Sequence, residues 1–154
     1  MTFNAKELRF RSIMRELIKR IHTDALLLGA CDKFTGLENM EEIVRLLQSP
    51  QGEEFCMKHR FPSRRVFREF LKYKPDEYGV YIDAGRIELT EPKDVYLIGK
   101  TSATIHFEET EGHRVRLLHG AKATIHAGGW SVVRVLADED SKCYIVKSGR
   151  ARIL

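Results

Sequence analysis

Cysteine is scarce in this 154-residue sequence, which contains only Cys31, Cys56 and Cys143. The three residues lie far apart and form no C-x-x-C pair, and at least one thiol must stay unpaired. Such usage argues against a disulfide framework and favours a reducing compartment. We therefore expect a cytoplasmic protein.

Long apolar runs are also missing. No stretch approaches the roughly 20 apolar residues that a membrane-spanning helix needs. The segment "LLLGAC" ending at Cys31 has the small residues of a lipoprotein cleavage box, but its apolar run is only "ALLLGA", and polar residues 22–24 interrupt it. A signal peptide needs about 7 to 15 apolar residues. We expect neither export nor contact with a membrane.

Sequence motifs for catalysis and cofactor binding are absent as well. There is no H-E-x-x-H, no C-x-x-C and no phosphate-cradling glycine loop, and Ser131 in "GGWSVV" lacks the G-x-S-x-G elbow. The glycine pair before Trp130 is more typical of a corner between strands than of a ligand loop. The sequence thus predicts no catalytic, cofactor-binding or metal-ligating residue, and we expect a protein that is not an enzyme.

Strong charge of one sign is missing too. Residues 1–78 hold 15 Lys/Arg against 12 Asp/Glu, and residues 79–154 hold 11 against 10, for a formal net charge of +4. A dedicated nucleic-acid binder usually carries a clustered basic stripe. The sequence pI of about 9.0 therefore does not by itself indicate nucleic-acid binding.

What the first half does contain is helical periodicity. Apolar residues recur at steps of three and four, with charged residues between them. "DALLLGAC" (24–31) either extends the first helix or forms a buried connector, and "SPQG" (49–52) breaks the second. Ser63 is placed to cap the last helix, and the polar "KYKPDEYG" (72–79) ends the region. The helices are expected over residues 4–22, 38–48, 52–59 and 63–71.

The segment 52–71 resembles a helix-turn-helix, with Phe61 and Pro62 in the turn. The resemblance implies that Arg64, Arg65 and Arg68 contact phosphates or base edges. The turn lacks the glycine often found there. The alternative, which we favour, is a plain helical packing unit with its phenylalanines in the core.

From residue 80 onward the period changes from helical to alternating. Apolar pairs separated by one residue mark short strands with one face inward. Successive pairs are mostly 7 to 10 residues apart, with one interval of 12 where "FEETEGHR" forms an enlarged turn. The pairs are Val80/Ile82, Ile87/Leu89, Val95/Leu97, Ala103/Ile105, Val115/Leu117, Ala123/Ile125, Val133/Val135, Cys143/Ile145 and Ala151/Ile153.

The tetrapeptide "ATIH" occurs twice, in residues 102–107 and 122–127, twenty residues apart. A repeat of this length with two strands and two turns fits a flattened β-solenoid, in which stacked coils continue one core. Ile105, Ile125 and Ile145 would then form an internal stack. The alternative is an antiparallel β-sandwich, since strands 8 to 12 residues apart suit that class too. No Asn-Gly or Asp-Gly hairpin turn is present to favour it.

We therefore predict an α+β chain, with a helical region over residues 1–78 and a two-faced β-solenoid over residues 79–154, its core closed at one end by the helices. Residues 80–154 resemble β-solenoid proteins, such as the bactofilin-like and right-handed β-helix groups, in their rhythm alone. Such folds host scaffolds, adhesins, assembly modules and some enzymes. The resemblance therefore implies an architecture and no activity.

Alternation turns His106 and His126 outward, beside Thr104 and Thr124. Stacked on adjacent coils, the two imidazoles could share a metal ion with Glu108 nearby, which would suit a metal-dependent enzyme. Zinc sites normally require three or four protein ligands, and no third is set by spacing. A solvated Thr/His ladder is the simpler interpretation.

The strongest pattern is thus a repeat that builds surface without a pocket, so we expect a protein-interaction or assembly module with an unknown protein partner. In "GRARIL" the edge of the final coil comprises Arg150, Ala151, Arg152 and Ile153. Two arginines cannot cover the open end of a hydrophobic core. We expect a homo-oligomer, formed as a two-fold dimer through this coil. Nucleic acid bound through segment 52–71 is the alternative partner.

Overall fold

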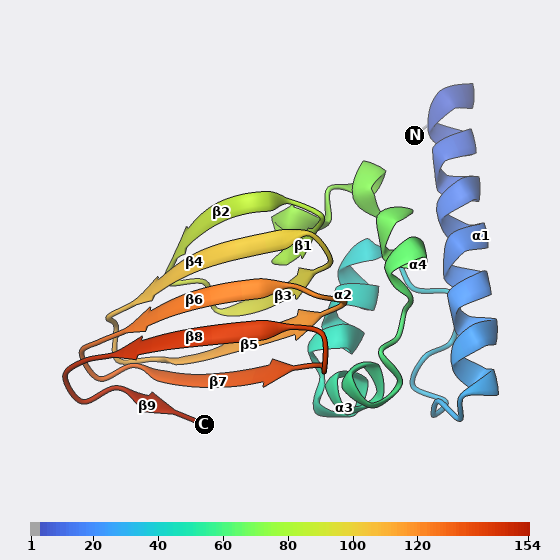
Figure 1. Ribbon diagram of the computed structural model, residues 1–154. Coiled ribbons are helices and arrows are strands. Elements are labelled where there is room, and N and C mark those ends of the chain that lie inside the picture. The colour runs from blue at the N-terminus through green and yellow to red at the C-terminus, as the bar shows by residue number, and fades with distance from the viewer. Residues whose placement is uncertain (1–3) are drawn as a thin grey trace. The chain divides into compact units, whose positions relative to one another are not determined.

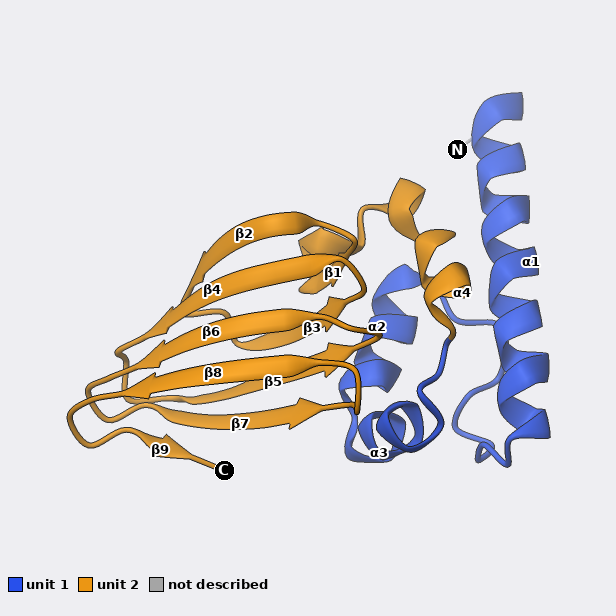
Figure 2. Ribbon diagram, in the orientation of Figure 1, with its two compact units in different colours: residues 1–62 blue, residues 63–154 orange. Residues whose placement is uncertain are grey.

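The computed structural model describes residues 4–154. The chain divides between Pro62 and Ser63 into two compact units (Figure 2). The first contains helices, and the second contains a short helical stretch followed by the strands.

The helices of the first unit are α1 (Ala5–Leu27), α2 (Met40–Gln48) and α3 (Pro50–His59). Asn4 and Asn39 each form a capping box with the glutamate three residues on, which satisfies backbone N–H groups that a helix start leaves unpaired. The predicted break at residues 49–52 is narrower in the structure. Ser49 ends α2 and caps α3. Pro50 can begin α3 directly after it, because proline is tolerated at the first position of a helix.

Helix α1 is longer than the predicted 4–22, because the apolar stretch after Asp24 continues it. Its buried residues are Leu17, Ile18, Ile21 and Ala25, which recur at helical spacing along one face. Of the two possibilities for "DALLLGAC", the first part extends the helix and the rest leaves it at Gly29, whose φ of +90° suits glycine. Within residues 4–154, no helix has the length and hydropathy needed to cross a membrane.

The predicted helix over residues 63–71 is wrong in its extent. Ser63 does cap α4, but α4 ends at Arg68 (Arg64–Arg68), and the 3₁₀ turns η1 (Leu71–Tyr73) and η2 (Pro75–Tyr78) follow. Phe67, Phe70 and Tyr73 are all buried and lie three residues apart. A 3₁₀ helix has three residues per turn, so the tighter winding keeps all three rings on one side.

The strands form two parallel sheets with different strand orders (Figure 1). Sheet A has the order β1-β3-β5-β7-β9 and sheet B the order β2-β4-β6-β8. The chain thus alternates between the sheets, which makes a β-solenoid of about four turns, and the antiparallel sandwich is excluded. The bounds are Val80–Ile82, Gly85–Thr90, Asp94–Ile98, Thr101–Phe107, Gly112–Leu118, Lys122–Ala127, Val132–Ala137, Lys142–Lys147 and Arg152–Ile153 for β1 to β9 in turn.

The register confirms the repeat of about 20 residues. Ser102 pairs with Lys122 and Lys122 with Lys142, so the two "ATIH" segments lie side by side on β4 and β6. The first coil is shorter, since Gly85 pairs with Thr101. The corners are also linked from coil to coil; for example, the Gly128 N–H donates to the Phe107 carbonyl at 2.8 Å, and the Ser148 N–H to the Ala127 carbonyl at 2.8 Å.

The solenoid core lies between the two sheets and is built from most of the predicted inward pairs. The prediction of Val80/Ile82 as an inward pair is wrong, because Tyr81 pairs with the core residue Leu97 and packs against the core, whereas Val80 and Ile82 pair with Tyr96 and Ile98. Ile105 and Ile125 are fully buried, and each pairs in register with the next isoleucine of the predicted stack. Burial of such a side chain contributes about 1.5–3 kcal/mol. Ile145, the last member, is 40% exposed because no described residue lies beyond β8 in sheet B.

Candidate functional site

Two of the three arginines predicted to contact nucleic acid bind a carboxylate of the first coil. The Arg64 guanidinium donates to Asp83 Oδ1 at 3.1 Å, and Arg68 Nε donates to Asp83 Oδ2 at 2.5 Å. Arg65 is exposed on the same short helix. Asp83 therefore anchors α4 to the corner between β1 and β2.

The backbone around Asp83 is shaped to receive this contact. Lys100 donates its backbone N–H to Asp83 Oδ1 at 2.7 Å. A Cβ atom at Gly99 would lie 2.2 Å from the same oxygen, so only glycine leaves room for the carboxylate. Burial alone would raise the pKa of the Asp83 carboxyl, but the hydrogen bonds from Lys100, Arg68 and Arg64 outweigh it and hold that pKa below its ordinary value.

These contacts bear on how α4 could meet nucleic acid. The helix has five residues, less than one and a half turns, whereas the recognition helix of a homeodomain presents side chains spread over about eight positions. Arg64 and Arg68 would have to leave a partly buried carboxylate to reach phosphates. Contact between the three arginines and nucleic acid stays a prediction, and no feature of the described residues adds to it.

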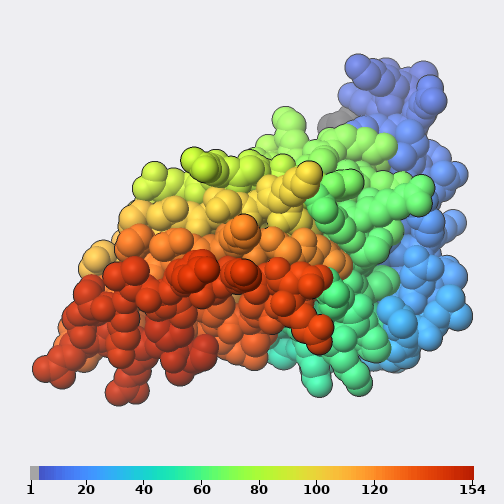
Figure 3. Space-filling view, in the orientation of Figure 1, coloured from blue at the N-terminus to red at the C-terminus, as the bar shows by residue number. Residues whose placement is uncertain are grey.

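His106 and His126 lie as expected on the outer face of sheet B, which is turned toward the viewer in Figure 3, with its strands coloured from yellow-green to red. Their rings stack at a centroid distance of 5.0 Å and an angle of 10°. His106 Nε2 lies 3.1 Å from Glu88 Oε1, while the Glu108 carboxylate lies against Gly128. Residues 4–154 contain no group of three His, Cys, Asp or Glu side chains that could hold a metal ion.

An acid–histidine pair, which the sequence did not reveal, joins Glu91 in the turn after β2 to His113 at the start of β5. His113 Nδ1 is 2.9 Å from the Pro92 carbonyl oxygen, and Nε2 is 3.4 Å from Glu91 Oε2. The other Glu91 oxygen accepts the backbone N–H groups of Glu108 and Glu109 at 2.5 and 3.2 Å. Glu91 thus ties the acidic turn to the preceding coil. The His113 ring is buried, so the pair has a structural role.

Replacing Glu91 with alanine is expected to lower the free energy of unfolding by about 2–3 kcal/mol, because two backbone N–H groups lose their hydrogen-bond acceptor and the buried His113 ring loses the carboxylate beside it. Glu91→Gln keeps an oxygen for the turn and offers an N–H to the imidazole, so its cost should stay below about 1 kcal/mol. Urea unfolding followed by circular dichroism measures both. Equal losses in the two variants would show that Glu91 does not hold the turn through hydrogen bonds.

The last coil exposes four large apolar side chains. Tyr144, Ile145 and Val146 of β8 are exposed, and so is Leu154 after β9. In the described part of the chain, the outer edges of β8 and β9 pair with no strand. Burial raises the pKa of the Cys143 thiol at this end to about 11, so little reactive thiolate forms at neutral pH.

The four residues predicted for this edge differ in their exposure and in what they contact. Arg150 lies over the Trp130 ring at 5.4 Å, and Ala151 is buried at the corner. Arg152 is exposed, and Ile153 is half-buried against the core. The prediction did not include Tyr144, Ile145 and Val146, although their place on the final sheet B strand follows from the same alternation.

Comparisons of the chain with protein-family models, with curated proteins and with solved structures find no match.

Proposed function

We propose that the chain is a non-enzymatic assembly module that docks through the open end of its solenoid. The observation that supports this proposal is the exposure of the last member of the core stack. Ile145 is 40% exposed, whereas Ile105 and Ile125, in the same column, are 0% exposed. An uncovered core end beside unpaired strand edges is a surface that proteins normally cover.

The occupant that fits this end best is a second copy of the chain. A copy related by a two-fold axis perpendicular to the sheets extends both sheets at once, with β8 facing β8 and β9 facing β9. The same residues then meet on both sides, so the end of one core covers the other. Strand edges supply backbone hydrogen bonds, and the inward column around Ile145 supplies apolar contact.

No comparable observation supports the resemblance to bactofilin-like proteins or DNA binding. The resemblance to bactofilin-like proteins remains a hypothesis that rests only on the spacing of the strands. DNA binding through segment 52–71 would use arginines of which two already bind Asp83. Both are therefore secondary to assembly through the last coil.

Replacing Ile145 with lysine is expected to convert a dimer into a monomer, because a charge at the centre of the interface cannot be buried without a partner. Sedimentation velocity at about 1–100 µM would show the shift, and far-UV circular dichroism would confirm the fold. Ile153→Lys on β9 should act in the same way. Ser102→Lys adds the same charge on the outer face of β4 and should leave the dimer intact.

A wild-type chain that remains monomeric at 100 µM would contradict self-association. Dissociation by Ser102→Lys to the same extent would place the interface elsewhere.

A further inference from the structure

His113 is a histidine at an inward position of the solenoid core. It is buried and lies two residues before the core residue Val115. In the same column, Val133 on β7 pairs with it in register, and Ile153 on β9 pairs with Val133. The His113 ring lies against Phe107 at a centroid distance of 4.2 Å. Where the later coils place an apolar side chain, β5 therefore places one that can gain or lose a proton.

The contacts of the two ring nitrogens determine where protons can lie. His113 Nδ1 is 2.9 Å from the Pro92 carbonyl oxygen. A carbonyl oxygen only accepts, so Nδ1 must carry the single hydrogen that a neutral imidazole has. Nε2 of a neutral ring would then face Glu91 Oε2 at 3.4 Å with a lone pair on each side. Among the described residues, neither of these two buried atoms has a hydrogen-bond partner. A second proton on the ring turns the contact into a charge-assisted hydrogen bond.

The surroundings favour placing that proton on the imidazole. Glu91 Oε1 accepts the backbone N–H groups of Glu108 and Glu109, and such donors favour an ionised carboxylate. Alternation turns Arg114 and Arg134 to the outer face of sheet A, away from the ring. Three exposed glutamates thus stand against one exposed lysine at this corner. The other charged side chains on the elements around the pair are Lys93, Glu108, Glu109, Glu111, Arg114 and Arg134.

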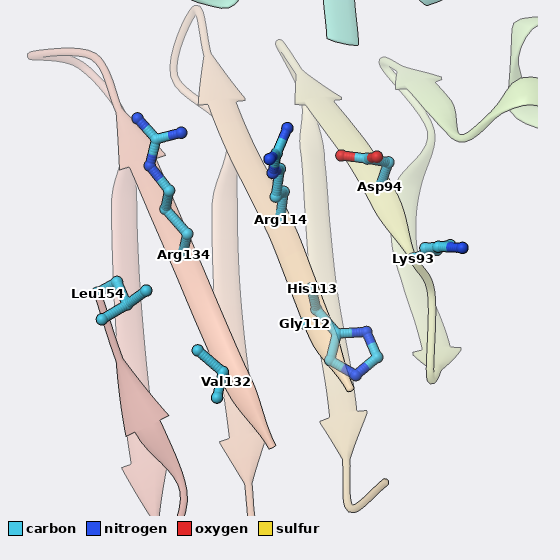
Figure 4. A pocket seen from close by; sticks show the side chains of 8 residues that line it. All are labelled: Lys93, Asp94, Gly112, His113, Arg114, Val132, Arg134 and Leu154. Atoms are coloured by element: carbon cyan, nitrogen blue, oxygen red, sulfur yellow. The ribbon is translucent and has the colours of Figure 1, made fainter. Parts of the chain in front are cut away.

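The buried ring lies within reach of protons from solvent. His113 borders a pocket of about 440 Å³ on sheet A, where Gly112 contributes no side chain and Val132 lies on the next strand (Figure 4). The protonation of the pair can therefore follow the pH of the surroundings.

Glu91 couples the pair to the acidic turn, residues 108–111. One of its oxygens faces His113, and the other holds two N–H groups of that turn. Glu91 also has a φ of +51°, in the left-handed region that favours glycine, so its contacts must offset backbone strain. Loss of the second ring proton leaves a carboxylate oxygen against a lone pair. The Glu91 side chain is 17% exposed and can turn toward water, and the turn then loses both hydrogen bonds.

We propose that Glu91 and His113 form a proton-dependent latch on the acidic turn. While the pair holds its shared proton, Glu91 binds the turn to the preceding coil. When the pair loses that proton as the pH rises, the turn is released. Neither residue belongs to β8 or β9, so the latch is independent of the assembly proposed above.

The ring nitrogens of the wild-type protein test the first step. Long-range ¹⁵N–¹H NMR spectra should show both nitrogens of His113 protonated at about pH 6 and only Nδ1 protonated at about pH 9. A ring that never carries both protons between these pH values would overturn the proposal. So would a ring with its hydrogen on Nε2 at high pH, because Nδ1 could then donate nothing to Pro92.

Opening of the turn is measured with an endopeptidase that cleaves after glutamate. The rate of cleavage within residues 108–111 is divided by the rate for a free peptide of residues 105–114, which removes the pH dependence of the peptidase. In the wild type, this relative rate should rise at least about fivefold from pH 6 to pH 9, because cleavage reports the population of the open turn.

Two variants of Glu91 separate the latch from a purely structural contact. Glu91→Gln keeps an oxygen for the turn and donates an N–H to a neutral Nε2, so its relative rate should differ less than about twofold between the two pH values. Glu91→Ala should be cleaved rapidly at both. A pH-independent wild-type rate, an equal rise in Glu91→Gln, or a turn that still closes at low pH in Glu91→Ala would overturn the proposal. The ring spectra need no variant, so they decide the matter even if Glu91→Gln does not fold.

Discussion

Replacing Ile125 with alanine is expected to lower the free energy of unfolding by about 2–4 kcal/mol. Ile125 is fully buried in the middle of the core stack, with Ile105 and Ile145 paired to it on either side. Both neighbouring strands are hydrogen-bonded to β6, so the backbone cannot move in to fill the space that the lost carbons leave. The cost is therefore the lost burial and the cavity together.

Ile145→Ala is the matched control, because it removes the same atoms from the same column at its exposed end. At protein concentrations low enough for a monomer, its cost should stay below about 1 kcal/mol. Urea unfolding, monitored by the fluorescence of the single tryptophan, Trp130, reports on both variants. If the last coil is an interface, the cost of Ile145→Ala will rise with protein concentration. Equal costs for both variants at low concentration would contradict the stack as described.

Replacing Asp83 with alanine is expected to cost about 2–4 kcal/mol of unfolding free energy, the second large effect. The carboxylate receives hydrogen bonds from Lys100, Arg64 and Arg68, and its removal leaves several donors without a partner at a partly buried corner. Part of the cost is backbone strain, since Asp83 has a φ of +47°, which alanine tolerates less well. Urea unfolding at neutral pH measures the loss.

The charge of Asp83 also predicts a pH dependence. Its pKa in the folded chain lies below the ordinary value, so the folded state favours the ionised carboxylate. The stabilisation is therefore fully present above the unfolded pKa of about 4 and is lost as the pH falls through the folded pKa.

Asp83→Asn separates the charge from the shape, since asparagine tolerates positive φ and keeps an oxygen for the Lys100 N–H. Between pH 5 and pH 2, the wild type should lose more stability than this variant. Parallel pH profiles for the two proteins would show that the carboxylate charge contributes nothing at this corner.

The strands were predictable because their cause is local and repeated. Inward residues must alternate with outward residues along each strand, which produces the period of two. Each coil must place its inward pair beside that of the previous coil, which produces the repeat of about twenty residues, and both periods can be seen in the sequence. His106 and His126 turn outward for that reason. The same spacing of twenty relates Arg114 to Arg134, which pair in register on β5 and β7.

The helical stretch after Ser63 was less predictable, because its form depends on what it packs against. Helical periodicity extended α4 to residue 71, but burial of Phe67, Phe70 and Tyr73 on one side favours a three-residue turn after Arg68. Helical periodicity and local helix propensity are all that the sequence offers here, and the free energy of helix propensity is small for each residue. Burial of three aromatic rings is larger and decides the local winding.

By itself, the sequence determined the two-faced solenoid, its core stack and the outward face of His106 and His126, since alternation and repeat length leave each of these side chains only one face. At β1 the alternation did not decide the face, because Tyr81 and not Val80 or Ile82 packs against the core. Only the tertiary structure decided which charges meet. Asp83 with Arg64 and Arg68, and Glu91 with His113, join residues at spacings outside the repeat. Such contacts depend on where a corner or a short helix places each side chain. This placement does not recur at a fixed spacing, so no pattern in the sequence predicts it.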